Sequence, residues 1–237
     1  MNGNYNDIID IIITLIDDEE IANSIVVSGS IVPYIIMNKE SYEYHTDFYV
    51  LVKEKKISNV RDKIKKLSKE YAFDVISDSK TYSKNDYGFK IKYENTTVGF
   101  FPYSLIDNNF SIKTYGLNES TKEVKLKTKI VPNITKSSVI RLTKFTKEKT
   151  LRIMSPEFIL ADKEVREKEP GNPTKETMHL LNKISDESVL KVVRESVSNT
   201  KIKVETKKMK ENNLLLIVIL GVLILLLVVV AYICFKK

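Results

Sequence analysis

The sequence predicts an α+β protein: a mixed β-sheet with flanking helices, a C-terminal helical segment and one C-terminal transmembrane helix. Three observations support this prediction. Helix-like and strand-like segments alternate in the first third of the chain, strand-like runs then follow one another directly, and helices return after residue 155. Such an order is typical of an antiparallel or mixed sheet with helices on one face.

The N-terminal elements alternate between helix and strand. Isoleucines at helical spacing between Ile8 and Ile16 predict an amphipathic helix, and the β-branched run SIVVSG (24–29) predicts a buried strand. VPYIIMNK (32–39) has a proline in its first turn and predicts a short helix. DFYVLV (47–52) predicts a second strand, and the apolar stripe of residues 56–71 predicts a surface helix.

Strand-like runs dominate the middle of the chain. YGFKIKYE (87–94) and TVGFFPY (97–103) predict one hairpin, and SIKTYGL (111–117) with EVKLKTKIV (123–131) predicts another. The chain is then expected to become helical. Ser155-Pro156-Glu157 combines an N-cap hydroxyl, a first-turn proline and an acid near the helix dipole, and two further helices are expected near 175–184 and 186–198.

A long apolar run near the C-terminus indicates a membrane span. Leu214 to Phe235 contains 22 residues without a charge, about 33 Å as a helix, which matches the bilayer core. We therefore expect a tail-anchored protein. Its parts are then an α+β domain (1–150), a helical segment packed on it (151–200), a basic juxtamembrane linker (201–213) and the transmembrane helix (214–235).

Lysine placement predicts the orientation and explains the basic net charge of +7. Residues 201–237 contain 7 Lys and 2 Glu, which leaves 31 basic and 29 acidic residues in the first 200. Composition therefore gives the folded domain no nucleic-acid signal. Five of those lysines precede the span, which predicts a cytoplasmic domain next to anionic lipid. The single cysteine, Cys234, excludes a disulfide framework and a thiolate metal cluster.

A Gly-Ser pair, a short helix and a His-x-Asp motif at the head of a strand form the most specific pattern in the chain. This arrangement resembles the nucleotidyltransferase superfamily of the polymerase-beta type, particularly its minimal and antibiotic-modifying branches. The matching residues are Gly29, Ser30, His45 and Asp47. DYGFKIKYENTTVGFFPY (86–103) resembles the hairpin that brings the third acid. MSPEFILADKEVREK (154–168) resembles the family's helical segment, with Lys163 at the position of the helix lysine.

The resemblance implies a nucleotidyltransferase-like fold over about residues 5–185, and a site for Mg²⁺ and a nucleoside triphosphate. Nucleotidyl transfer uses two divalent cations roughly 4 Å apart, held by carboxylates. By resemblance, Asp47 is the catalytic and metal-binding acid, and Gly29, Ser30 and Lys163 hold the nucleotide. Backbone N–H groups of a Gly-Ser turn at a helix start can cradle phosphate.

The departures from the family pattern concern the metal ligands. Tyr49 stands two residues after Asp47, where a second aspartate is expected, and Gly99 stands where the third acid is expected. A neutral phenol is a poor ligand for a hard cation. Glu94 and Asp86 flank the hairpin, and either acid can replace the missing metal ligand only if the backbone places it next to Asp47. The sequence therefore predicts a nucleotidyl-transfer site with impaired metal chemistry.

Each of these residues also has a plain structural interpretation. Gly29 permits a tight turn between strand and helix, and Ser30 is a possible N-cap. Asp47 and His45 are compatible with an ordinary turn, and Lys163 with a solvated charged face.

Three functions remain open at this level. The first is a membrane-anchored, catalytically impaired nucleotidyltransferase-like protein that binds a nucleotide or a regulatory protein partner. The second is an active metal-dependent enzyme that modifies a small molecule, protein or RNA and uses Asp47 with Glu94. The third is a non-catalytic membrane scaffold that binds no nucleotide.

Overall fold

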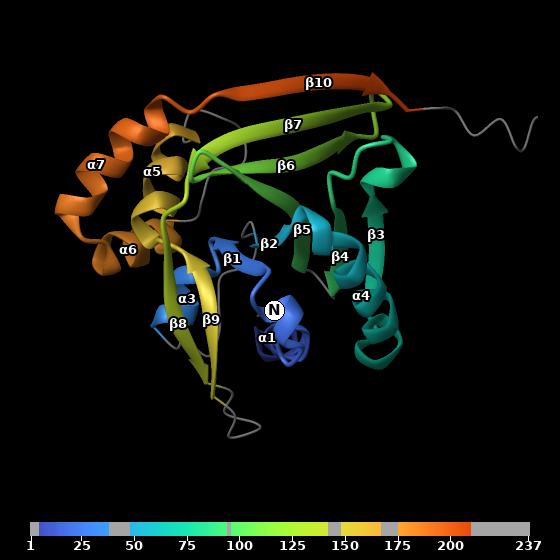
Figure 1. Cartoon of the computed structure of the whole chain (residues 1–237), viewed down its shortest axis with the longest axis horizontal. Helices are drawn as coiled ribbons and strands as arrows, with labels where there is room; N and C mark the ends of the chain where they lie inside the picture. The colour runs from blue at the N-terminus through green and yellow to red at the C-terminus, as the bar shows by residue number, and fades with distance from the viewer. Residues whose placement is uncertain (1–4, 38–47, 94–95, 142–147, 167–174, 210–237) are drawn as a thin grey trace, which may run out of the picture.

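The computed structural model describes residues 5–37, 48–93, 96–141, 148–166 and 175–209 (Figure 1). Within these ranges, ten strands form one mixed sheet with α-helices around it. The strands are β1 (Ile25–Gly29), β2 (Phe48–Lys53), β3 (Asp74–Asp78), β4 (Phe89–Tyr93), β5 (Thr96–Ile106), β6 (Asn109–Asn118), β7 (Glu123–Pro132), β8 (Thr135–Arg141), β9 (Glu148–Met154) and β10 (Ile202–Lys208).

The main path of the sheet runs β10-β7-β6-β5-β2-β1-β9-β8, and β4 joins β5 with β3 beside it. The pairs β1–β9 and β2–β5 are parallel, and the other pairs are antiparallel. The long strand β5 branches the sheet, because its first half pairs with β4 and its second half with β6. This branch places β4 and β6 along one edge of β5, while β2 pairs with the other edge.

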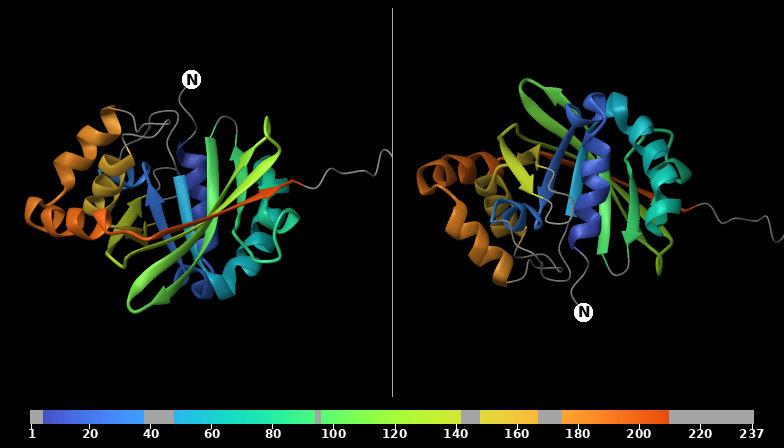
Figure 2. Two further views of the ribbon diagram at one scale, coloured as in Figure 1. Left: turned by 90° about the horizontal axis from the view of Figure 1, so that it is seen from above. Right: turned by 90° about the horizontal axis from the view of Figure 1, so that it is seen from below.

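The helices lie in two groups, which Figures 1 and 2 show on different sides of the sheet. The first group packs under β1, β2 and β5, and the second group lies at the left of Figure 1, beside β7, β8 and β9. The first group contains α1 (Tyr5–Ile16), α2 (Glu19–Ala22) and α4 (Ile57–Tyr71); the second contains α3 (Val32–Ile36), α5 (Pro156–Arg166), α6 (Lys175–Ile184) and α7 (Glu187–Ser198).

The core forms where α1 and α4 cover the central strands. α1 buries isoleucines on nearly every side, and α4 buries only its predicted stripe, Ile57, Val60, Ile64 and Leu67. The central strands contribute fully buried β-branched and aromatic side chains, including Val27, Val50 and Phe100. Burial of such side chains contributes about 1.5–3 kcal/mol each. The core therefore holds β1, β2 and β5 as a rigid platform.

Within the described residues the structure confirms the expected helices and the strands of both hairpins, and it corrects the region between residues 133 and 154. No strand was expected between the second hairpin and the helical segment that was to start at residue 151, but β8 and β9 form an antiparallel pair there. Leu151 and Ile153 are buried at a spacing of two, which is the period of a strand. Because β9 pairs with β1, the expected boundary at residue 150 falls inside a strand of the sheet.

The expected linker (201–213) also differs from the structure. Residues 202–208 form β10, which pairs with β7 along its whole length. Its alternation of apolar and charged residues has the period of a strand, and lysine is a common edge-strand residue. No helix in the described part of the chain is long and apolar enough to cross a bilayer. The run from Leu214 to Phe235 lies outside the described residues.

Candidate functional site

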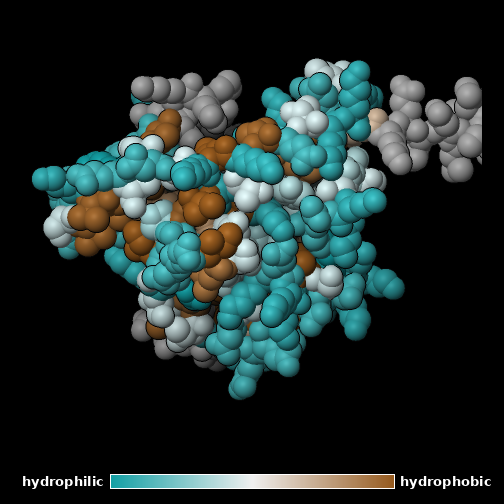
Figure 3. Space-filling model, turned by 45° about the horizontal axis from the view of Figure 1, so that its top comes forward, coloured by the Kyte–Doolittle hydropathy of each residue, from teal (hydrophilic) through white to brown (hydrophobic). Residues whose placement is uncertain are grey.

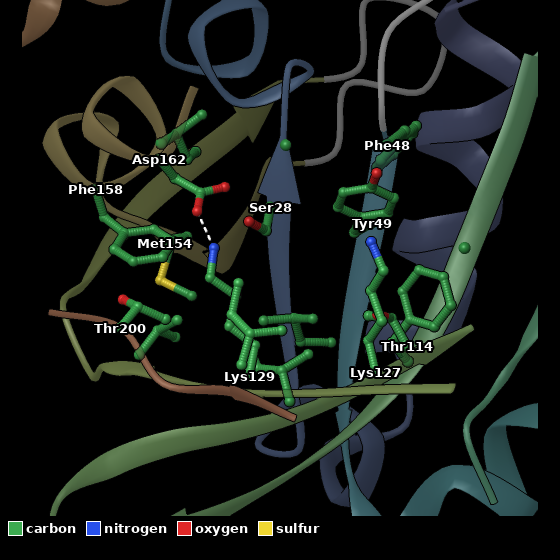
Figure 4. Close-up of a pocket in the computed structure, with 18 of the residues that line it drawn as sticks. Ser28, Phe48, Tyr49, Thr114, Lys127, Lys129, Met154, Phe158, Asp162 and Thr200 are labelled. Carbon is green, nitrogen blue, oxygen red and sulfur yellow. Dashed lines mark hydrogen bonds and ion pairs between the residues drawn. The ribbon is translucent and has the colours of Figure 1, made fainter. Parts of the chain in front are cut away.

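A cleft of about 600 Å³ opens between the branched sheet and the helices α5 and α7. Its walls come from β1, β2, β4, β5, β6, β7, α5, the residues that end α7, and the adjoining ends of β9 and β10 (Figure 4). Val165 and Ile202 line it although their side chains are 53% and 56% exposed. Figure 3 shows apolar side chains along the left and middle of the molecule, and hydrophilic ones on the right. The cleft thus combines apolar walls with polar groups, as ligand sites do.

The wall of the cleft contains a row of residues that lie next to one another across neighbouring strands. Ser28 of β1 is paired with Tyr49 of β2, and Tyr49 is paired with Gly99 of β5. Gly99 is paired in turn with Lys90 of β4. Directly paired residues present their side chains on the same face of a sheet. We call Ser28, Tyr49, Gly99 and Lys90 the cleft row, and all four line the cleft.

The cleft row brings together the two positions at which the sequence departs from the family pattern. Tyr49 and Gly99 lie side by side in the parallel β2–β5 pair. At these two positions the cleft row therefore has a phenol and a residue without a side chain, and neither is a carboxylate.

Aromatic rings occupy the space over Gly99. A Cβ atom placed on Gly99 lies 2.3 Å from the Phe101 ring. Phe101 packs edge-on against Tyr49, with ring centroids 5.4 Å apart, and against Tyr115, with centroids 6.2 Å apart. A side chain at residue 99 would therefore require Phe101 to move.

The charged residues in the cleft wall are mainly lysines. Lys129 forms an ion pair with Asp162 of α5, which Figure 4 shows across the cleft. Lys127 is exposed, and Lys90 is half-buried with its Nζ atom 5.2 Å from the centre of the Tyr115 ring. Burial lowers the pKa of Lys90 from its ordinary 10.5. The described wall therefore contains three cations and one carboxylate.

Tyr115 is held as a neutral phenol. Burial is the largest influence on its pKa and raises it well above 10, although a 2.7 Å hydrogen bond with Ser77 acts in the opposite direction. The Tyr115 ring thus provides Lys90 with a π-face and no negative charge.

The structure brings only part of the predicted site together. Gly29 lines the cleft and has φ +90°, a conformation that favours glycine. Ser30 is 1% exposed and is not part of the cleft wall. Lys163 is 3% exposed, so a solvated charged face was the wrong interpretation. Asp47 and Glu94 lie outside the described residues, as does His45.

Asp86, the other candidate acid, is part of a structural cluster away from the cleft wall. Arg61 of α4 is 4% exposed and forms ion pairs with Asp78 at 2.8 Å and with Asp86 at 2.7 Å. Burial acts to raise the pKa of Asp86, but hydrogen bonds from Arg61 and from the Gly88 backbone act in the opposite direction and outweigh it. The pKa of Asp86 is therefore below its usual value. We call these three residues the Arg61 cluster. Asp86 thus compensates a buried guanidinium.

The described donors do not fit a two-metal centre. No group of three or more metal-ligating side chains occurs in the described part of the chain. Asp162 is the one carboxylate in the described cleft wall, and its oxygen already accepts from Lys129. Two divalent cations need several carboxylate oxygens.

Sequence reasoning missed the lysines of the cleft. Lys90 lies between two buried residues of β4, Phe89 and Ile91, whereas Lys127 of β7 follows the buried Leu126 and Lys129 lies between the half-buried Thr128 and the exposed Ile130. The runs YGFKIKYE and EVKLKTKIV predicted two strands, each in its own hairpin. They could not predict that the two lysine-bearing faces meet in one cleft, because that depends on how β5 branches.

Comparisons with known proteins identify a structural relative. No model of a known protein family matches the chain, and no curated protein sequence matches it either. A solved structure described as ANT(2")-Ia in complex with adenylyl-2"-tobramycin is similar, with TM-score 0.50 and 15% sequence identity. The match covers 81% of this chain and 95% of that chain. That protein is an aminoglycoside nucleotidyltransferase, and the chain described here has a nucleotidyltransferase-like fold.

Proposed function

We propose that the protein binds a nucleotide in its cleft and does not carry out two-metal nucleotidyl transfer. The observation that supports this most directly is the pairing of Tyr49 with Gly99, where the family pattern expects acids. A single aspartate, Asp47, then remains from the pattern. One carboxylate is too few to clamp two cations while the nucleotide is attacked.

The cleft retains features that suit a nucleotide. Its volume of about 600 Å³ lies within the range of small-molecule sites. Tyr49, Phe101 and Tyr115 offer aromatic surface, and Lys90 and Lys127 offer positive charge toward a phosphate. Aromatic stacking on bases contributes about 1–3 kcal/mol per base.

Thermal unfolding of the full-length chain with ATP, GTP, CTP and UTP tests the binding part. We expect at least one nucleotide to raise the unfolding temperature, because a ligand that binds only the folded state stabilises it. Gly116 supplies a matched pair of variants, because it lines the cleft and a Cβ atom there meets nothing within 4 Å. We expect Gly116→Phe to fill the cleft and abolish the shift, and Gly116→Ala to preserve it.

The catalytic part has its own test. Radiolabelled nucleotide is incubated with the chain, Mg²⁺ or Mn²⁺ and mixtures of small molecules, proteins or RNA. We expect no transfer. Transfer that disappears in Asp47→Asn would contradict this part and favour an active enzyme that uses Asp47 and Glu94. If no nucleotide shifts the unfolding temperature, the scaffold hypothesis replaces the proposal.

We further propose that the apolar run from Leu214 to Phe235 anchors the domain to a membrane, with the domain in the cytoplasm. The support is the uncharged length of the run and the lysines that precede it. The chain should remain in membranes after extraction at alkaline pH, and deletion of residues 214–235 should release it. Removal of the domain by protease added outside intact cells would contradict the orientation.

A further inference from the structure

Lys90 occupies a fixed position beside the place where the third acid is expected. Its strand neighbours Phe89 and Ile91 are 0% and 1% exposed and point into the core, so Lys90 must point to the other face. That face is the cleft wall, and Gly99 lies directly opposite in the β4–β5 pair. Because Gly99 has no side chain, it places nothing between Lys90 and the aromatic rings of the cleft wall.

The Lys90 ammonium differs from the other buried cations in its surroundings. Arg61 is paired with two aspartates, and Lys129 with Asp162. Within the described residues, Lys90 has no carboxylate partner, and its ammonium lies near the neutral Tyr115 ring. A partly buried charge without a counter-ion is costly unless a ligand supplies one. The position therefore favours an anionic group bound in the cleft.

The glycine and the lysine depend on each other. Side chains that face each other across an antiparallel pair have Cβ atoms about 4.5–5.5 Å apart. An aspartate at residue 99 would therefore lie within reach of the Lys90 ammonium and neutralise it. With Gly99, the positive charge of Lys90 remains available to a ligand.

From this arrangement we infer that Lys90 binds the phosphate chain of the nucleotide and supplies the positive charge that a divalent cation supplies in an acid-lined site. This inference rests on the proposed function and adds the group that neutralises the negative charge of the bound phosphates. Lysine binds phosphate as a point charge with three donors. Nucleotide binding in this cleft is therefore independent of metal and dependent on Lys90.

Calorimetric titration of ATP into the full-length chain in EDTA tests the inference. The variants are Lys90→Met, Lys90→Arg and Lys92→Met. Lys92 is the matched control, because it lies on the same strand and the same face but is exposed and outside the cleft wall. Thermal unfolding of each variant without ligand confirms that it is folded.

We expect Lys92→Met to bind ATP like the unaltered chain, and Lys90→Met to bind about tenfold or more weakly, as for a lost hydrogen bond to a charged group. Lys90→Arg should retain most of the affinity because it keeps the charge. Equal affinity for Lys90→Met and the unaltered chain would overturn the inference. So would binding that requires Mg²⁺, although nucleotide binding itself would then stand. No binding with or without Mg²⁺ would overturn both proposals.

Discussion

The Arg61 cluster and the cleft differ in how their cations are paired. Two aspartates pair with Arg61, whereas within the described residues the cleft has one carboxylate, which pairs with Lys129 and not with Lys90. Arg61 lies against Asp78, Asp86 and the face of the Phe89 ring. Lys90, one residue along the same strand from Phe89, lies on the opposite face of the sheet, where no acid of the described residues pairs with it. The two sites thus lie on opposite faces of the sheet at β4.

This difference shows where the chain uses its carboxylates. In the Arg61 cluster, two aspartates hold α4 to β3 and to the start of β4, so they stabilise the fold. In the cleft, the described residues offer one carboxylate, which holds α5 to β7 through Lys129. The charge that remains for a ligand is therefore positive.

The largest expected effect is the loss of stability on breaking the Arg61 cluster. We expect Arg61→Met to lower the free energy of unfolding by about 3–5 kcal/mol, because Asp78 and Asp86 lose their buried partner. Denaturant unfolding of the full-length chain measures this. Lys149→Met is the control, since Lys149 and Asp17 form a half-exposed pair, worth about 0–1 kcal/mol. Equal effects of the two substitutions would show that the Arg61 cluster is not a structural unit.

A smaller effect is expected from adding a side chain to the cleft row. Gly99→Ala should cost about 1–3 kcal/mol of stability, because the new methyl group overlaps Phe101. The cost should fall to less than half in a Phe101→Leu background. A double-mutant cycle by denaturant unfolding measures this coupling. Independent effects of the two substitutions would contradict the packing described for the row.

Acid should weaken the Arg61 cluster before it affects the cleft lysines. The pKa of Asp86 is lowered in the folded state, so its contribution to stability is complete above the unfolded value of 3.8 and is lost as pH falls through the folded value. Asp86→Asn should make the free energy of unfolding less dependent on pH below neutrality. An unchanged slope in denaturant titrations at acid pH would contradict this.

The smallest effect concerns alkaline pH and the cleft. Burial lowers the pKa of free Lys90, and a bound phosphate favours its charged form and raises the pKa. ATP affinity should therefore be complete below the pKa of free Lys90 and decline several-fold as pH rises through it. The decline should be absent in Lys90→Arg, since arginine stays charged. Titrations from neutral to alkaline pH would show whether the two chains differ.

The sequence predicted most elements whose pattern is local. α4 follows its apolar stripe, and Ser155 caps α5 by accepting a 3.1 Å hydrogen bond from the Phe158 backbone. β8 and β9 were missed although they pair with each other as chain neighbours, and β10 was missed because its partner β7 is more than 70 residues away in the chain. Short strands of this kind are stabilised by long-range pairing, which local propensity does not contain.

The sequence singled out two residues of the cleft wall, Tyr49 and Gly99, but it did not predict the lysines of that wall. The resemblance led us to expect acids at these two positions, and the strand register pairs Tyr49 with Gly99. Glu157 was expected only to favour a helix dipole, but it is fully buried, pairs with Lys136 at 2.8 Å and accepts from the Asp186 backbone. Lys90 of β4 and Lys127 of β7 line the same cleft because β5 pairs with both β4 and β6, and no local sequence pattern predicts that branch.

Equilibrium binding of radiolabelled ATP to the full-length chain, in EDTA and then in excess Mg²⁺, tests the central claim most directly. If the cleft provides its own positive charge, the two dissociation constants will agree within about twofold, a difference below 0.5 kcal/mol. Affinity that rises tenfold or more with Mg²⁺, about 1.4 kcal/mol, would show that a metal supplies the charge. That result would contradict the account of Lys90 and Gly99.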